Sequence, residues 1–327
     1  MESKEDQYSP PVEPQKHSYY IQRIKSGASI YPRPFWFIEF NISSTLGFDI
    51  ENLPVLTSSK VVVKDEWSKV LLRGEAESEY IFLTLLGKDM IPFGVVGFRP
   101  ILLPCKTKQT GFFLYDIGAL RNIGKYHMAE WLSKAQNDWE KGRTEKSATE
   151  FPRVLDRLDR YRMLSHQNPS LRYLVLYNAR GANAMAYVLD RTSIPQIPLT
   201  KEIGLGNRMF VVDHTNYYFG SNNQDETHYL AAILNSSVSN KNVKPFQPRG
   251  QYGKRDIGIR PFMQPIPQFD SKNEIHVNLA KLSKECHDII SKHRFAKKGF
   301  KSMRNEALRI LSAKISDIDM AVIKIVK

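Results

Sequence analysis

The side chains best suited to chemistry in this sequence are the arginines and lysines of one loop in its C-terminal third. The loop reads KPFQPRGQYGKRDI over residues 244–257, and with one residue just beyond it supplies four cations: Arg249, Lys254, Arg255 and Arg260. Gly250 and Gly253 allow the backbone to approach another surface closely. Guanidinium and ammonium groups bind phosphate oxygens, and arginine also reads guanine in the major groove. The loop therefore predicts a surface that binds a polyanion such as DNA.

Four further side chains complete the predicted DNA-binding set: Gln247, Gln251, Tyr252 and Arg33. The two glutamines are candidates for reading adenine, because a carboxamide pairs with the adenine edge through two hydrogen bonds. Arg33 stands between two prolines and is expected to reach a phosphate. The alternative is internal packing, with Arg255 paired to Asp256 and Tyr252 buried. For any single residue we favour that internal role, and for the loop as a whole we favour contact with DNA.

The distribution of charge agrees with a polyanion-binding face. The chain has 47 Lys and Arg against 34 Asp and Glu, a net charge of +13. Residues 241–327 hold 19 of the basic and 8 of the acidic side chains, which leaves 28 and 26 for the other 240 residues. Such asymmetry is typical of a nucleic-acid-binding surface, and a solvated basic helix explains the charge alone equally well.

The sequence contains none of the motifs that mark the common catalytic sites. It lacks a Walker phosphate loop, a glycine-rich dinucleotide fingerprint after a strand, a GxSxG elbow and an HExxH helix. Cys105 and Cys286 are too far apart for zinc-ligand spacing, and we expect Cys105 to be a small buried apolar residue. Asp213 and His214 form the one candidate acid–base pair, and a strand end explains them at least as well. We therefore expect no catalytic, metal-binding or cofactor-binding residue.

The sequence also predicts a reduced, cytoplasmic setting with no membrane contact. No run of about 18 apolar residues is present, as a transmembrane helix requires. The first 18 residues are polar and rich in proline, lack the apolar core of a secretory signal, and are expected to form a flexible tail.

Both strands and helices are expected in the rest of the sequence. Extended segments are predicted at residues 29–40, 55–64, 98–105 and 207–221, with a short helix followed by a strand at 79–95. Residues 171–190 read as a hairpin. Helices are predicted at residues 127–143, 155–169, 276–294 and 302–325, with a further helical stretch after residue 225. In the first of them Trp131, Ala135 and Trp139 share one face.

Several of these segments, in this order, resemble one family. They are GASIYPRPFWFIEF, the sequence around Trp67, ESEYIFLTLLGKDMIPF, AEWLSKAQNDWEKGR, LDRLDRYRMLSHQNP and the block over residues 229–276. Together they are similar to the C-terminal target-recognition region of adenine-N6 DNA methyltransferases, above all of large single-chain restriction-modification enzymes. The AILNS, QPRG…RDI and PIPQFD segments also resemble recognition domains of type I specificity subunits. The resemblance spans residues 19–294.

The catalytic half of such an enzyme is not recognisable here. The family binds S-adenosylmethionine on a glycine-rich strand–turn and holds the flipped adenine with an (Asn/Asp)-Pro-Pro-(Tyr/Phe) motif, and this sequence has neither. Its only Pro-Pro pair, Pro10 and Pro11, lies between Ser9 and Val12. No PD-(D/E)xK nuclease core is evident either. The resemblance thus implies the recognition part alone, encoded as a separate subunit, a gene fragment or an excised domain.

The resemblance implies an α+β fold in which a twisted, largely antiparallel target-recognition domain over residues 19–275 precedes a helical part over residues 276–327. It implies a specificity module that binds double-stranded DNA and catalyses nothing by itself. S-adenosylmethionine is then expected on a methyltransferase partner, in cis or in trans. The alternative is a protein-interaction or scaffold subunit without direct DNA contact. A third possibility is an enzyme that uses Asp213 or Asp256.

Overall fold

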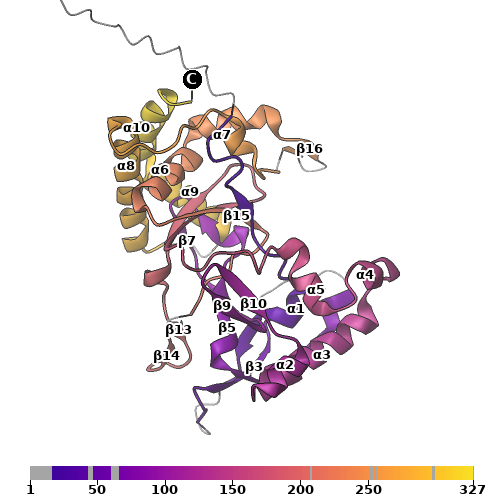
Figure 1. The fold of residues 1–327 in the computed structure, drawn as a ribbon. Helices are drawn as coiled ribbons and strands as arrows, with labels where there is room; N and C mark the ends of the chain where they lie inside the picture. The colour runs from indigo at the N-terminus through magenta and orange to yellow at the C-terminus, as the bar shows by residue number, and fades with distance from the viewer. Residues whose placement is uncertain are drawn as a thin grey trace, which may run out of the picture.

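The computed structural model describes residues 17–42, 47–59, 66–206, 208–250, 253–254, 256–296 and 299–326. It confirms a mixed α and β fold with antiparallel sheets and a helical C-terminal part (Figure 1). None of the helices in these ranges combines the length and the apolar character that crossing a membrane requires.

The central element is a four-stranded antiparallel sheet. Its strands lie in the order β1 (Lys25–Ser26), β15 (Asn216–Ser221), β11 (Tyr173–Asn178) and β12 (Ala186–Asp190). All six residues of β11 are buried. Successive side chains of a strand point to opposite faces, so Leu174 and Leu176 join one hydrophobic core while Val175 and Tyr177 join a second. The predicted hairpin at 171–190 is confirmed as the β11–β12 pair.

The first core is built from small antiparallel sheets. They pair β2 (Ile38–Phe40), β3 (Asn52–Thr57) and β4 (Arg73–Glu77); β5 (Ile81–Thr84) with β8 (Arg99–Leu102); and β9 (Cys105–Lys108) with β10 (Gly111–Leu114). Shorter pairs are β6 (Met90–Ile91) with β7 (Gly94–Val95) and β13 (Ile197–Pro198) with β14 (Gly204–Leu205). Cys105 is fully buried, as predicted, and burial raises the pKa of its thiol.

Four helices follow these strands along the chain: α2 (Ile117–Asn122), α3 (Tyr126–Gly142), α4 (Glu145–Glu150) and α5 (Val154–Leu158). The helix predicted at 127–143 is confirmed as α3, which packs on β4. The Trp139 ring stacks on Trp67 with centroids 5.5 Å apart, and the Trp131 indole donates to the Phe35 carbonyl at 2.8 Å. These aromatic contacts fix the buried face that the spacing predicted.

The second core lies under the C-terminal helices. They are α6 (Gln224–Asn235), α7 (Ser237–Val243), α8 (Glu274–Lys292), α9 (Phe300–Ile310) and α10 (Ser312–Ile323). α6 covers one face of the sheet, is buried from Thr227 to Asn235, and packs against α8 on its other side. The domain boundary expected at 275/276 falls inside the first turn of α8, whose buried face belongs to the same core as α6.

Several predicted elements differ from the structure. The helix expected at 155–169 ends at Leu158, because the Asp159 carboxylate accepts hydrogen bonds from the Leu164 and Ser165 amides instead. The short helix expected within 79–95 is replaced by β5, β6 and β7 with brief 3₁₀ turns. Within the described residues 208–221, only β15 forms a strand of the sheet. Residues 29–40 contain a short helix, α1 (Arg33–Trp36), before β2.

The buried His228 and the partly buried His287 lie beside the second core. The His228 and His287 rings are 4.8 Å apart, and His287 Nε2 accepts a hydrogen bond from the Val188 amide at 2.9 Å. Burial, the charge of His287 and that of Lys284 lower the pKa of His228 to about 2. Burial lowers the pKa of His287 to about 4, although the Ser283 carbonyl opposes this shift. Both rings are therefore neutral in the folded protein.

We expect acid to destabilise the fold through these rings. Below pH about 6.5 the unfolded chain protonates both histidines and the folded chain does not, so the free energy of unfolding falls as the pH drops from about 6.5 towards 4. Each ring contributes a slope of up to about 1.4 kcal/mol per pH unit. Urea unfolding between pH 5 and 7 measures it, and His287→Gln should reduce the slope by about one histidine's share. An unchanged slope in His287→Gln, or the same reduction in the exposed-site control His166→Gln, would contradict this account.

Candidate nucleic-acid interface

The predicted basic loop forms a small hairpin. β16 (Arg249–Gly250) pairs antiparallel with β17 (Gly253–Lys254), so that Arg249 and Lys254 are cross-strand partners. The structure describes the backbone of these four residues, and Gln251, Tyr252 and Arg255 lie outside the described residues. Figure 1 shows the hairpin extending outward beside α7. Two basic residues thus occupy paired positions on the strands of a hairpin that extends outward.

The residues that flank the hairpin, 246–247 and 256–258, form its stem, and the second of these segments is hydrogen-bonded to the central sheet. The amides of Ile257 and Gly258 both donate to the Ala179 carbonyl, at 3.0 and 3.2 Å, directly after β11 ends. The Tyr177 hydroxyl donates to the Gly258 carbonyl at 2.8 Å. Gly258 has a φ of +48°, a conformation that favours glycine. These bonds hold the stem against the edge at which β11 ends.

Arg260 braces the same stem. Its Nε donates to the Phe246 carbonyl at 2.9 Å, and its Nη1 donates to Asp256 Oδ2 at 2.8 Å. Phe246 and Asp256 lie on either side of the hairpin, so the guanidinium joins its two ends. Gln247, also in the predicted set, is 4% exposed and lies just before β16. Both side chains make internal contacts here, the role favoured for individual loop residues.

Arg33 lies away from the hairpin in α1. Its side chain is 18% exposed, stacks over the Phe37 ring at 5.4 Å, and places Nη2 3.8 Å from Asp213 Oδ1. Asp213 is fully buried, and Thr215 donates to its Oδ1 from the amide at 2.9 Å and from the hydroxyl at 2.6 Å. Burial by itself raises the pKa of the Asp213 carboxyl, but His214, Arg33 and Thr215 together hold that pKa below its ordinary value.

A cleft opens beside the hairpin stem. It has a volume of about 590 Å³ and is lined by Ser26, Ser29, Gly87, Lys88, Arg160, Tyr161, Met163, Ala179, Arg180, His214, Thr215, Tyr217, Asp256 and Arg304. We call it the cationic cleft, because Lys88, Arg160, Arg180 and Arg304 line it with Asp256 as the one carboxylate. Arg180 and Asp256 are bridge partners, so the cleft and the hairpin stem share a wall. Figure 1 shows α5 and the hairpin on the same side of the molecule.

The cations of the cleft differ in how free they are. Arg304 is committed to the backbone: its Nε donates to the Met90 carbonyl at 3.0 Å and its Nη2 to the Gly87 and Lys88 carbonyls at 3.2 and 3.0 Å. Arg160 lies 3.2 Å from Glu150. Lys88 and Arg180 are exposed, and neither has an ion-pair partner among the described residues.

The surroundings of Lys88 favour an anion. Although Lys88 is exposed, partial burial of its ammonium lowers its pKa, the positive charges of Arg99 and Arg33 lower the pKa further, and Asp89 opposes this shift. A bound anion such as a phosphate would offset this repulsion. The positive charges around Lys88 are therefore compatible with an anionic ligand.

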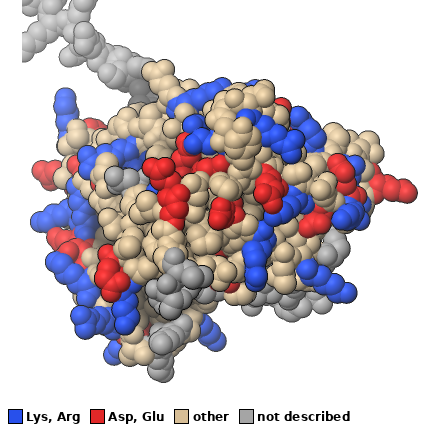
Figure 2. Space-filling view, turned by 90° about the horizontal axis from the view of Figure 1, so that it is seen from below, with Lys and Arg blue, Asp and Glu red and all other residues tan. Residues whose placement is uncertain are grey.

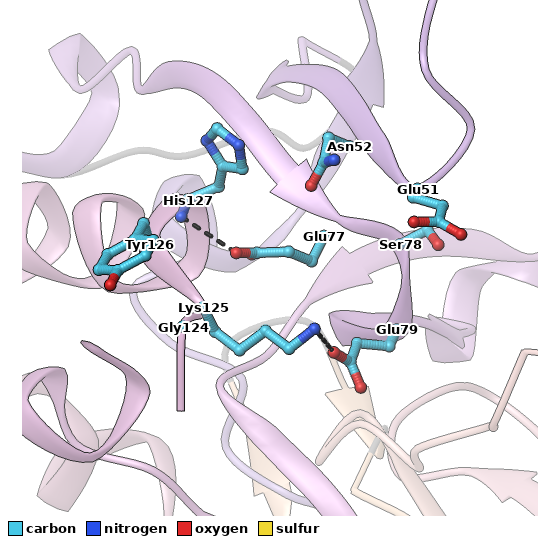
Figure 3. Close-up of a pocket in the computed structure, with 9 residues that line it drawn as sticks. All are labelled: Glu51, Asn52, Glu77, Ser78, Glu79, Gly124, Lys125, Tyr126 and His127. Carbon is cyan, nitrogen blue, oxygen red and sulfur yellow. Dashed lines mark hydrogen bonds and ion pairs between the residues drawn. The ribbon is translucent and has the colours of Figure 1, made fainter. Parts of the chain in front are cut away.

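A second pocket, of about 560 Å³, has the opposite character. Figure 3 shows Glu51, Glu77 and Glu79 lining it beside the start of α3. Glu77 accepts hydrogen bonds from the amides of His127 and Met128 at 3.1 and 2.8 Å, and so caps that helix from β4. Glu79 is paired with Lys125 and with Lys106. These carboxylates stabilise the fold and disfavour a polyanion.

The underside of the molecule, shown in Figure 2, also differs in charge from the cationic cleft. Figure 2 shows Lys and Arg mixed with Asp and Glu across it, with several acidic side chains near its middle. Such interspersed charge is typical of an ordinary solvated surface. Among the surfaces described, the hairpin and the cationic cleft are therefore the better candidates for binding DNA.

The fold is similar to part of a solved enzyme. The chain matches the structure of the Type IIL restriction-modification enzyme MmeI in complex with DNA with a TM-score of 0.52 and 12% sequence identity. The match covers 92% of this chain and 32% of that enzyme, so this chain spans about a third of its length. No protein-family model and no curated protein sequence matches the chain. At this identity the likeness shows a shared fold.

Most residues of the cleft are not recognisable as a site from the sequence alone. Lys88, Arg180 and Arg304 come from the turn before β6, the end of β11 and α9, and no spacing in the sequence connects them. Only the tertiary fold brings them together, because α9 packs beside β6 and the end of β11 faces the same opening. The basic loop was recognisable because its cations are neighbours in sequence.

We expect Arg260 to position the hairpin through its geometry and not through its charge alone. Arg260→Lys keeps the positive charge but loses the guanidinium geometry that bonds Phe246 and Asp256 at once. The amides at 246–258 should then exchange hydrogen about tenfold faster, which corresponds to about 1.4 kcal/mol of local stability. Hydrogen exchange read by mass spectrometry measures this. Arg172→Lys, at an ion pair to Asp190 on an exposed face, is the matched control. Unchanged protection at 246–258 in Arg260→Lys would show that the brace does not hold the hairpin.

Proposed function

We propose that this protein is the DNA sequence-recognition module of a restriction-modification adenine-N6 DNA methyltransferase. It binds duplex DNA and positions it for a methyltransferase domain or subunit. The observation that carries the proposal is the continuity of the cationic cleft with the basic hairpin through the Arg180–Asp256 wall. One surface thereby offers cations for the phosphate backbone and an outward-extending hairpin for the base edges.

The two parts of this surface suit two different tasks. Lys88 and Arg180 supply salt-dependent, sequence-independent affinity by neutralising phosphates. The hairpin is a narrow two-stranded ribbon, a shape that the major groove admits. Arg249 and Lys254 stand on its strands, and Gln251, Tyr252 and Arg255 complete the predicted reading set. Arg260 and Gln247 support the stem. Arg33 lies beside Asp213, so only the exposed part of its guanidinium is open to a phosphate.

The catalytic step belongs to a partner in this proposal. An enzyme that methylates adenine must take the base out of the stack, and a second domain must hold the duplex while this happens. The partner would supply S-adenosylmethionine and the catalytic motif. The similarity to about a third of a larger restriction-modification enzyme solved with DNA supports a role as one part of such a system.

A protein-interaction subunit is the second candidate. A groove of about 510 Å³ between α8 and α10 is lined by the apolar residues Ile275, Leu282, Met320 and Ala321 and by the polar residues Glu274, Asn278, Asp317 and Lys324, and Met320 is 58% exposed. Apolar side chains around a groove favour contact with another protein. Binding that persists in high salt and needs no DNA would favour this function, because phosphate contacts weaken steeply with salt.

Removing the free cations of the cleft tests the main proposal. We expect Lys88→Ala with Arg180→Ala to weaken binding to all duplexes to a similar extent and to reduce the slope of log K against log[salt] by about 2. Fluorescence anisotropy with a labelled duplex measures both quantities. The control Lys272→Ala with Lys281→Ala removes the same charge from exposed positions at α8 and should leave the slope nearly unchanged. Equal effects of the two pairs would show that the cleft is not the phosphate-binding surface.

The hairpin has a different signature. We expect alanine at Arg249, Lys254 and Arg255 together to weaken binding, to flatten the salt dependence and to reduce discrimination between preferred and random sequences, because base contacts carry the choice. Binding selection from a randomised duplex pool, with the wild-type chain in parallel, measures the discrimination. Unchanged affinity, slope and sequence preference would make the hairpin a structural element only.

A further inference from the structure

We propose that the Tyr161 ring is a stacking platform for an unpaired nucleobase at the cationic cleft. The inference rests on the proposed DNA-binding function and adds a specific ligand chemistry to it. An enzyme that acts on a base extrudes that base from the duplex, which leaves unpaired bases to be held. Tyr161 lines the cleft and is 70% exposed.

The backbone displays this ring at a conformational cost. Tyr161 and the following Arg162 have φ angles of +53° and +58°, which residues other than glycine rarely adopt. Because Tyr161 is 70% exposed, its ring buries little apolar surface that could offset this cost. Unfavourable backbone geometry that presents an exposed aromatic ring is a typical mark of a functional site.

The surrounding turn holds the ring in place. The Asp159 carboxylate accepts from the Leu164 and Ser165 amides at 3.0 and 2.9 Å, and the Asp159 carbonyl accepts from the Arg162 amide at 2.8 Å. Leu164 is fully buried in the first core and anchors the far end of the turn. The turn is therefore fixed before any ligand arrives.

Arg160 prepares the ring for stacking. Its guanidinium lies 4.6 Å from the ring centroid, and its Nη2 donates to the Tyr161 hydroxyl at 2.9 Å. A cation against one side of an aromatic ring leaves the remaining surface available to a flat partner, and nucleobases stack on such aromatic and guanidinium planes. The Glu150 carboxylate forms an ion pair with Arg160 at 3.2 Å.

The position of the ring favours a nucleic-acid ligand over a protein. Lys88 and Arg180 line the same cleft and are available to bind the phosphates on either side of a base. Another exposed tyrosine, Tyr126, provides the contrast: it is 66% exposed but lines the pocket of Glu51, Glu77 and Glu79. The two tyrosines are similarly exposed and differ in the charge around them.

The test compares two short duplexes that differ at one site. One is fully paired, and the other holds a 2-aminopurine opposite an abasic position. We expect the wild-type chain to bind the second duplex about tenfold more tightly and to quench its fluorescence. Tyr161→Gly suits the positive φ and should lose both the preference and the quenching while it keeps the affinity for paired DNA within about twofold. Tyr161→Phe should retain both, and Tyr126→Ala should behave as wild type.

Each outcome decides one question. Loss of the preference in Tyr161→Gly with retention in Tyr161→Phe supports the platform. Equal preference and quenching in the wild type and Tyr161→Gly, with binding to paired DNA intact, overturns the platform and leaves the proposed function standing. Failure of the wild-type chain to bind either duplex overturns both. Thermal unfolding of each variant separates loss of the ring from loss of the fold.

Discussion

The structure depends on one strand that is buried on both of its faces. β11 gives Leu174 and Leu176 to the first core and Val175 and Tyr177 to the second, so neither core is complete without it. Burying both sides of a strand favours an uninterrupted apolar run, which Leu174, Val175 and Leu176 provide between two tyrosines. Asn178 ends the strand and is buried, and its carboxamide satisfies the turn by donating to the Arg180 and Asn183 carbonyls and accepting from the Met185 amide.

The same strand end determines where the candidate site lies. Ala179 accepts the two hydrogen bonds that hold the hairpin stem, and Arg180 enters the cationic cleft. Asn216 in the neighbouring β15 is buried and donates to the Leu85 carbonyl at 2.8 Å, which ties the chain just before Gly87 and Lys88 to the sheet. Arg304 then joins α9 to that segment. Segments distant in sequence therefore converge on one opening because the sheet orders them all.

The parts of this arrangement that sequence could predict are those with local signals. The α3 helix follows from the spacing of Trp131 and Trp139, and the β11–β12 hairpin follows from two apolar runs around a polar turn. The segment after Leu158 has a helical pattern, but one carboxylate at Asp159 offers its backbone another set of hydrogen bonds, and pattern alone does not weigh that competition. The basic loop is local and was found. The four cations of the cleft come from four distant segments and carry no local signal.

If this surface binds DNA through its phosphates, the affinity must depend steeply on salt. We would measure the affinity of the purified chain for a random-sequence duplex over a range of salt, with and without S-adenosylmethionine. The account predicts that log K falls linearly with log[salt], by roughly 0.9 for each phosphate neutralised, and that S-adenosylmethionine changes nothing. Absence of binding at low salt, or binding that salt does not weaken, would contradict it.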